Sequence, residues 1–195
     1  MDYKWNDTKV DFIILGNQTD DQIIKELSFF AEKMDIANLS EGLITNFVDN
    51  NIDDIFKIIY VKKEELAELP NFKDKMVNKI YDNIQTAMAN ATLVQFMNAT
   101  NIFGHNFGHK RLEKIFVKHG NNFLKFMREH SKKQIYEDIM NIDGFDDITA
   151  NQFSENIGEF IKIFDKLTKA HQKQILDNSE IKKVSDKFKG KNYKS

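Results

Sequence analysis

The sequence predicts an all-α protein made of four tandem helix-hairpin-helix units, preceded by a short extended arm. Three observations lead to this fold class. A short phrase recurs four times in the 195 residues, and apolar residues around each copy recur at three- or four-residue spacing. In addition, one proline and eight glycines leave little that would interrupt helices. The chain is therefore interpreted first as a repeat protein.

The recurring phrase has Asn or Gly first, then Leu or Phe, one free position, and then Glu, Asp or His. Its copies start at Asn38, Asn71, Asn106 and Gly144, which are 33, 35 and 38 residues apart. Asn and Gly tolerate the positive φ of a tight bend, and Ser, Asp or Glu just beyond them favours a helix N-terminus. Each copy is therefore predicted to be a turn that starts a helix.

The apolar residues keep the same phase after every turn. Six and nine positions beyond the Asn or Gly, each copy has a residue suited to one buried helical face: Ile44 and Phe47, Val77 and Ile80, Leu112 and Ile115, Ala150 and Phe153. A helical pattern also precedes each turn. The predicted helices span, in order, about 20–34, 40–49, 52–59, 62–67, 73–89, 91–99, 108–118, 121–129, 131–140, 147–152 and 154–176.

The two ends of the chain are predicted to differ from this tandem helical domain, which covers residues 19–177. Residues 8–15 are a β-rich run, so residues 1–18 are interpreted as an extended arm or linker. Residues 178–195 form a basic tail, in which 181–195 contain six lysines and one acidic residue. A frayed, solvated terminus is the simpler interpretation of that tail.

Composition narrows the class of protein. There is no cysteine, which excludes disulfides and thiolate metal sites, and there is no apolar run long enough for a membrane span. We therefore expect a cytoplasmic protein, in the host cytoplasm if it is viral, with no membrane partner. The net charge of −2 means that any nucleic-acid contact must come from a local basic patch.

The predicted function follows from the chemistry of the turns. A hairpin beside a helix N-terminus presents backbone N–H groups that can bind a phosphate oxygen, without reading the base sequence. The third hairpin is the strongest candidate, the second is also basic, and the first is weaker. The candidate phosphate-binding residues are Gly104, His105, Asn106, Gly108, His109, Lys110 and Arg111, then Asn71, Lys73 and Lys75, then Asn38 and Ser40. Three aspartates surround Gly144, so the fourth hairpin is predicted to be mainly structural.

Other chemistry is poorly supported by the sequence. His105 and His109 are four residues apart, but Gly108 and the hairpin interrupt the helical face that a zinc pair needs, so no metal site is expected. No catalytic motif is present, and no catalytic residue is predicted. The phenylalanines at helical spacing are expected to form the core rather than to stack on bases.

With these hairpins in place, the chain resembles the C-terminal tandem helix-hairpin-helix region of NAD-dependent DNA ligases. Residues 68–75, 101–108 and 140–145 look like the second, third and fourth hairpins of that family, and residues 188–193 are similar to the opening strand of the BRCT domain that follows them. Most of the family's hairpin glycines are replaced here. The zinc cysteines and the adenylation-domain lysine motif are absent, as is a complete OB-fold.

The resemblance implies a non-catalytic DNA-binding part of a ligase that grips duplex DNA at a nick during replication or repair. It implies no cofactor on this chain, because NAD would be used by a catalytic partner with the adenylation and OB-fold domains. The chain would not ligate alone. Two alternatives remain open: a helical protein–protein interaction module, or the helix-hairpin-helix region of another repair or recombination factor.

Overall fold

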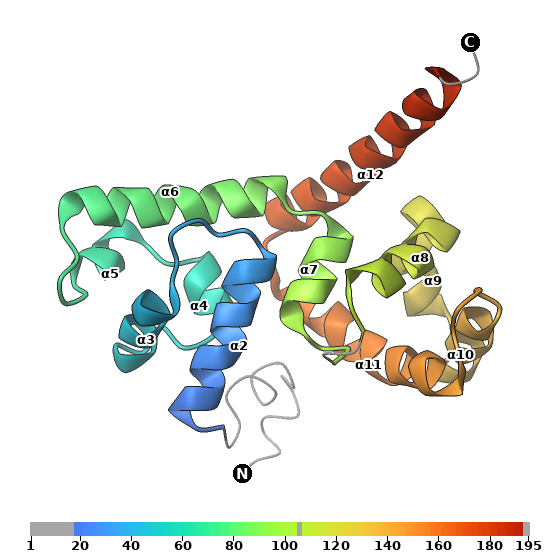
Figure 1. Ribbon diagram of the computed structural model, residues 1–195, viewed down its shortest axis with the longest axis horizontal. Helices are drawn as coiled ribbons and strands as arrows, with labels where there is room; N and C mark the ends of the chain where they lie inside the picture. Colours follow the sequence, from blue (N-terminus) through green and yellow to red (C-terminus); the bar gives the residue numbers. More distant parts are fainter. Residues whose placement is uncertain (1–17, 105–106, 193–195) are drawn as a thin grey trace. The chain divides into compact units, whose positions relative to one another are not determined.

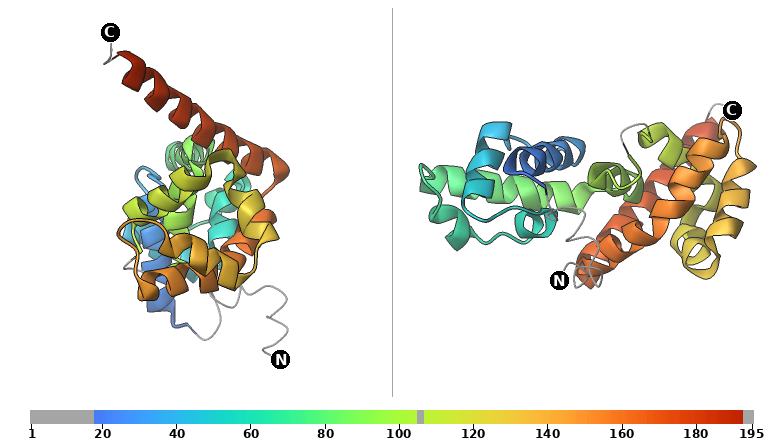
Figure 2. Two further views of the ribbon diagram at one scale, coloured as in Figure 1. Left: turned by 90° about the vertical axis from the view of Figure 1, so that its right-hand side faces the viewer. Right: turned by 90° about the horizontal axis from the view of Figure 1, so that it is seen from below.

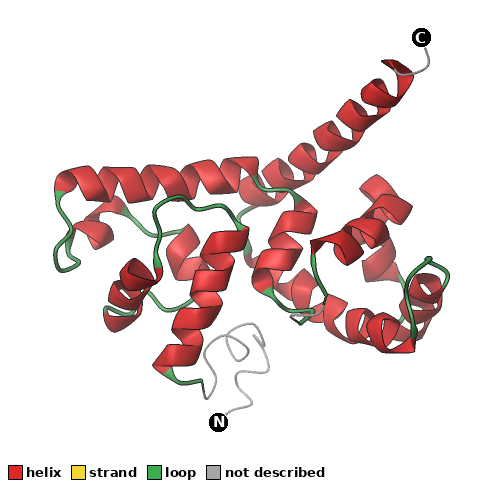
Figure 3. Ribbon diagram, viewed as in Figure 1, coloured by secondary structure: helices red, strands yellow, loops and turns green. Residues whose placement is uncertain are grey.

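The computed structural model describes residues 18–104 and 107–192, with side chains described as far as residue 180. Every regular element in these ranges is a helix (Figure 3), which confirms the all-α class. The predicted arm lies outside the described residues except for residue 18, and so do His105 and Asn106. The chain divides into two compact units, unit 1 (Met1–Ala89) and unit 2 (Asn90–Ser195).

Unit 1 is a cluster of helices built around a buried aliphatic and aromatic core. Side-chain caps start several of them: Thr19 accepts from the Gln22 N–H and Asp54 from the Lys57 N–H. Leu27, Ile44 and Phe47 are fully buried, as the helical phase predicts. The helices are α2 (Asp20–Lys33), α3 (Glu41–Asp49), α4 (Ile55–Ile59), α5 (Lys63–Ala67) and α6 (Asp74–Asn90), drawn in blue to green in Figure 1.

Unit 2 has a core dominated by phenylalanine. The long helix α11 (Asp147–Lys166) packs against its neighbours α9 and α10, as the views of Figures 1 and 2 show. The buried N–H of Leu93 donates to Ser179 Oγ at 2.9 Å, which joins α7 to α12. The other helices are α7 (Leu93–Thr100), α8 (His109–His119), the 3₁₀ turn η2 (Gly120–Asn122), α9 (Phe123–Glu129), α10 (Lys132–Met140) and α12 (Lys169–Asn192).

The C-terminal part differs from the helix limits expected from the sequence. The helices predicted at 147–152 and 154–176 are one helix, α11, which ends at Lys166, and a second helix, α12, which runs on to Asn192. The break comes at Leu167, whose backbone is extended, and Thr168 Oγ1 then accepts from the His171 N–H at 3.2 Å. Residues 188–192 are therefore helical, where similarity to a BRCT opening strand predicts an extended backbone.

None of the described helices combines the length and the apolar character that crossing a bilayer requires.

Candidate nucleic-acid interface

The four recurring phrases lie in four short connections between helices. We name them loop 1 (34–40), loop 2 (68–73), loop 3 (101–108) and loop 4 (141–146). The next helix begins three residues after the Asn or Gly of each phrase, at Glu41, Asp74, His109 and Asp147. Asn38, Asn71 and Gly144 have φ of 63°, 68° and 90°, as expected of turn residues. In loop 3 the described residues with positive φ are Asn101, with 55°, and Gly104, with 91°.

In unit 1, the helix that follows each loop has a side chain that binds the other loop. Asn46 of α3 donates from Nδ2 to the Pro70 carbonyl of loop 2 at 3.0 Å. In return, Asn83 of α6 donates to the Ala37 carbonyl of loop 1 at 2.8 Å. The two loops are therefore held beside each other.

Unit 2 has the same reciprocal arrangement. Lys114 of α8 donates from Nζ to the Asp143 carbonyl of loop 4 at 3.3 Å. Gln152 of α11 donates from Nε2 to the Phe103 carbonyl of loop 3. The four loops thus form two pairs, one within each unit.

Loops 1 and 4 each end in a residue whose side chain accepts a hydrogen bond from a backbone N–H in the first turn of the next helix. Ser40 Oγ accepts from the Leu43 N–H at 3.3 Å, and Asp146 Oδ1 accepts from the Thr149 N–H at 2.9 Å. Thr149 donates to this carboxylate from its N–H and also from Oγ1, at 2.9 Å each. The two hydrogen bonds, with a smaller contribution from the charge of Arg111, lower the pKa of Asp146 below its ordinary value of 3.8. Ser40 is therefore a helix cap, and loop 4 combines its cap with further acidic side chains.

The Asp146 cap is expected to make unit 2 sensitive to acid. Because the folded-state pKa lies below the ordinary value, the carboxylate adds stability that is present above about pH 4 and is lost as pH falls through the folded pKa. Asp146→Asn keeps a good capping residue without the charge. Its thermal midpoint should fall less than that of the wild type between about pH 6 and about pH 3. Equal losses would mean that this cap does not contribute to the acid sensitivity.

Loops 2 and 3 end without a side-chain acceptor. Lys73 precedes α6, and an ammonium group can only donate hydrogen bonds. Gly108 precedes α8 and has no side chain with which to cap it. The first N–H groups of a helix have no partner within that helix, so an anion can bind there. Each unit therefore pairs one loop that ends in a cap with one loop that does not.

Cations lie at both of these helix starts, although Asp74 is an acidic residue in the first turn of α6. Lys73 and Lys75 are exposed at the start of α6, as is Asn71 in the turn before it. At the start of α8, Lys110 is exposed, while Arg111 is half-buried and close enough to Asp146 to lower the pKa of that carboxyl. His109 Nε2 lies 3.8 Å from Glu113 Oε1. Of the residues predicted at the third hairpin, Gly108, His109, Lys110 and Arg111 thus lie at one helix N-terminus, while Gly104 lies earlier in loop 3.

The aromatic core holds loop 3 in place. Phe103 stacks on Phe153 of α11 with ring centroids 5.0 Å apart, and Phe107 lies 5.8 Å from the same ring. Both loop residues are buried. These phenylalanines therefore form the core, as the sequence predicts, and are not available to stack on bases.

Sequence reasoning missed the side chains that join the loops. Asn46, Lys114 and Gln152 each lie eight positions after the Asn or Gly of their own phrase. That common spacing was the available signal. It was not informative by itself, because the three residue types differ and no acceptor could be identified from the sequence.

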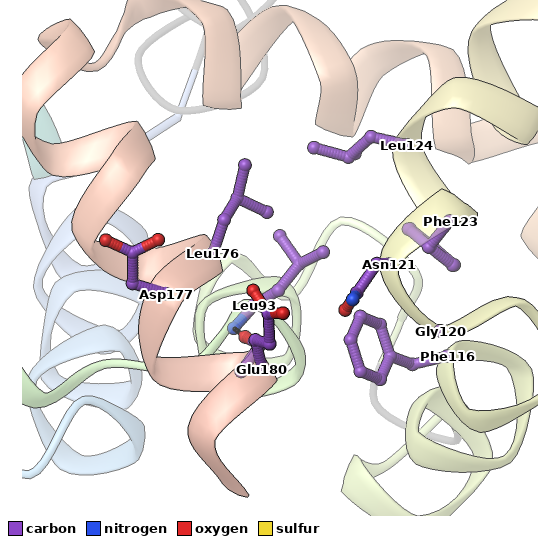
Figure 4. A pocket seen from close by; sticks show the side chains of 10 residues that line it. Leu93, Phe116, Gly120, Asn121, Phe123, Leu124, Leu176, Asp177 and Glu180 are labelled. Atoms are coloured by element: carbon purple, nitrogen blue, oxygen red, sulfur yellow. Dashed lines mark hydrogen bonds between the residues drawn. The ribbon is translucent and has the colours of Figure 1, made fainter. Parts of the chain in front are cut away.

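Unit 2 also has a pocket of about 210 Å³, whose lining includes none of the candidate phosphate-binding residues (Figure 4). Its lining includes the apolar side chains of Leu93, Phe116 and Leu176, with Asp177 and Glu180 beside them. Two carboxylates would repel a phosphate, so this pocket is a poor nucleotide site. Within the described part of the chain, no three His, Asp or Glu side chains are grouped so that they could hold a metal ion.

Comparison with known proteins shows similarity to DNA ligases, although no family model matches the chain. It is 31% identical over 170 residues to a DNA ligase of Acanthamoeba polyphaga mimivirus, which covers 87% of this chain and 27% of that protein. A DNA ligase of Clostridium tetani is 31% identical over 183 residues, or 87% of this chain and 25% of the relative. A Sulfurovum DNA ligase is 28% identical over 162 residues, or 80% and 23%.

The similarity covers most of this chain but only part of each relative. The chain spans about a quarter of the length of the curated relatives that it matches. It is therefore similar to one region of viral and bacterial DNA ligases.

Proposed function

We propose that this chain is a non-catalytic DNA-binding region or subunit of an NAD-dependent DNA ligase. It would hold duplex DNA at a nick through sequence-independent phosphate contacts, in DNA replication or repair. Loops 1–4 would be the hairpins of four helix-hairpin-helix units, arranged as two pairs. The observation that carries the proposal is the start of α8, where no side chain of Gly108 caps the helix and Lys110 and Arg111 lie in the first turn.

The physical basis is the binding of an anion by a helix N-terminus. Free N–H groups and the positive end of the helix dipole favour a phosphate oxygen, and nearby Lys and Arg add charge-assisted contacts. At the start of α6, Lys73 and Lys75 supply the same combination in unit 1. Such contacts bind the DNA backbone and carry no base specificity.

Charge is distributed unequally along the chain, which favours loop 3 over loop 2 as the stronger contact. Lys and Arg counted against Asp and Glu give −7 for residues 1–89, zero for residues 90–180 and +5 for residues 181–195, which together make the net charge of −2. The acidic unit 1 therefore repels DNA over about a Debye length, roughly 8–10 Å near physiological salt, and the part of unit 2 around loop 3 does not. Unit 2 should therefore contribute more of the affinity than unit 1.

The ligase context comes from the similarity to DNA ligases. A catalytic partner domain or subunit, with the adenylation and OB-fold parts, would use NAD to activate the 5′-phosphate at the nick. This chain would bind no cofactor and would work in the cytoplasm. Its contribution would be to keep the two DNA ends at the catalytic partner.

The test is a titration of nicked duplex against salt with the Lys110→Ala/Arg111→Ala variant. We expect weaker binding and a shallower dependence of log K on log salt, by about 0.9 for each phosphate that the variant no longer binds. A matched control is Lys132→Ala/Lys133→Ala, which removes the same charge from unit 2 at the start of α10, a helix capped by Ser131. The control should retain more affinity.

The outcomes separate the proposal from its alternative. If both double variants bind with the wild-type salt slope, loop 3 does not contact phosphate. If the wild-type chain associates with a catalytic ligase part but does not bind nicked duplex at low salt, the chain is a protein–protein module. Loops 2 and 3 would then lack phosphate binding, as is expected of the acidic loop 4 and the capped loop 1.

A further inference from the structure

Three side chains at equivalent positions of the repeat make equivalent contacts. Asn46, Lys114 and Gln152 lie eight residues after the turn residue of loops 1, 3 and 4, and each donates to a backbone carbonyl of the other loop in its unit. In the remaining repeat, Asn83 makes such a contact from one turn further along α6. The side chains differ, but all four are donors, so the shared feature is the hydrogen bond.

At Gln152 this contact reaches a candidate phosphate-binding loop. Its Nε2 binds the Phe103 carbonyl, and it occupies the space where a Cβ on Gly104 would lie. Gly104 has φ of 91°, a conformation that L side chains rarely adopt. The Phe103–Gly104 backbone is therefore in direct contact with the Gln152 amide.

The next residue of the same helix holds the same part of loop 3. Phe153 stacks on the Phe103 ring, while Gln152 binds the Phe103 carbonyl. Two backbone hydrogen bonds extend this contact along the chain: the Gly104 N–H donates to the Asn101 carbonyl at 3.1 Å, and the Phe107 N–H donates to the Gly104 carbonyl at 3.0 Å. Gly104, next to the residue that Gln152 binds, is thus bonded to Phe107, which directly precedes Gly108 at the start of α8.

We infer that Gln152 is a positioning residue for phosphate binding at the start of α8, an assignment that rests on the proposed function. It does not supply charge to the ligand. It holds the Phe103–Gly104 backbone so that the start of α8 and its cations are ordered before DNA arrives. A loop that is already ordered loses less conformational entropy on binding, and its affinity is higher for that reason.

The experiment measures nicked-duplex affinity for Gln152→Met, which keeps the length of the side chain but removes the donor. We expect about a five- to tenfold loss of affinity, the usual effect of one hydrogen bond, with the salt slope unchanged because no phosphate contact is removed. The control is Gln174→Met on α12, where the amide donates to Asn178 Oδ1 of its own helix at 3.0 Å. The control should bind like the wild type.

A double-mutant cycle distinguishes positioning from a general loss of stability. In the Lys110→Ala/Arg111→Ala background, Gln152→Met should cost much less affinity than it costs alone, because both changes act through loop 3. Equal losses in both backgrounds, or no loss in the wild-type background, would overturn the assignment. If the wild-type chain does not bind nicked duplex, the proposed function itself fails.

A rescue variant gives a readout that needs no DNA. Gln152→Lys places at this position the residue type that Lys114 supplies at the equivalent position of its own repeat. Hydrogen-exchange protection of the Phe107 N–H should fall in Gln152→Met and return in Gln152→Lys. Protection that stays at the wild-type level in Gln152→Met would show that Gln152 does not order loop 3.

Discussion

Phe153→Ala is expected to destabilise unit 2 by about 3–5 kcal/mol, the usual cost of removing a fully buried phenylalanine side chain. Phe153 is 0% exposed. Its ring stacks on Phe103 and Phe107 of loop 3 and meets Phe123 of α9 edge-on at 6.4 Å. The substitution removes the centre of this cluster, so a cavity forms between α11 and the loop.

Urea denaturation, monitored through the hydrogen exchange of the α11 amides, would measure this change for unit 2 separately from unit 1. The control on the same helix is Ile148→Ala, because Ile148 is 73% exposed and the change should stay within about 0.5 kcal/mol. Equal effects of the two substitutions would mean that α11 does not pack on loop 3 through Phe153.

Gly104→Ala and Gly108→Ala should have different effects on the stability of unit 2 although they lie in the same loop. At Gly104 a side chain meets both a φ of 91° and the amide of Gln152, so we expect a loss of about 1–3 kcal/mol. Gly108 has φ of −72° and nothing within 4 Å of an added Cβ. There the substitution should change the stability by less than about 1 kcal/mol, because the lower entropy of the unfolded chain favours alanine while glycine is the better N-cap residue.

DNA binding should separate the two glycines again. If a phosphate approaches the start of α8, the methyl group of Gly108→Ala would stand in its path, and affinity for nicked duplex should fall while the thermal midpoint stays near the wild-type value. Gly104→Ala should lower the midpoint and the affinity together. Wild-type affinity in Gly108→Ala would place the phosphate away from this helix start.

Much of the fold could be predicted from the sequence because its signals are local. The spacing of apolar residues indicated helices on both sides of every phrase, and α3, α6, α8 and α11 each begin within one residue of the predicted start. Caps such as Thr19 and Ser40 were recognisable from residue type. The C-terminal end was harder, because α12 continues through lysine-rich sequence without an apolar stripe to indicate it.

The candidate site was less predictable, for a physical reason. Lys73, Lys75, Lys110 and Gly108 could be identified from the sequence, because charge and the lack of a side chain are properties of single residues. Whether a helix start is capped could be partly inferred as well, since Ser40 and Asp146 are typical caps. The pairing of loop 1 with loop 2, and of loop 3 with loop 4, could not be inferred from the sequence, because it depends on contacts between residues far apart in the chain.

By itself, the sequence determined the helical class, the four turns and the cationic residues beside two of them, because backbone preference and side-chain charge act locally. Only the tertiary structure decided that the loops form two pairs and that Gln152 and Phe153 hold loop 3. Hydrogen bonds such as Gln152 to Phe103 and Asn83 to Ala37 join residues 49 and 46 positions apart. Such contacts form only when packing brings the helices together, so no local pattern specifies them.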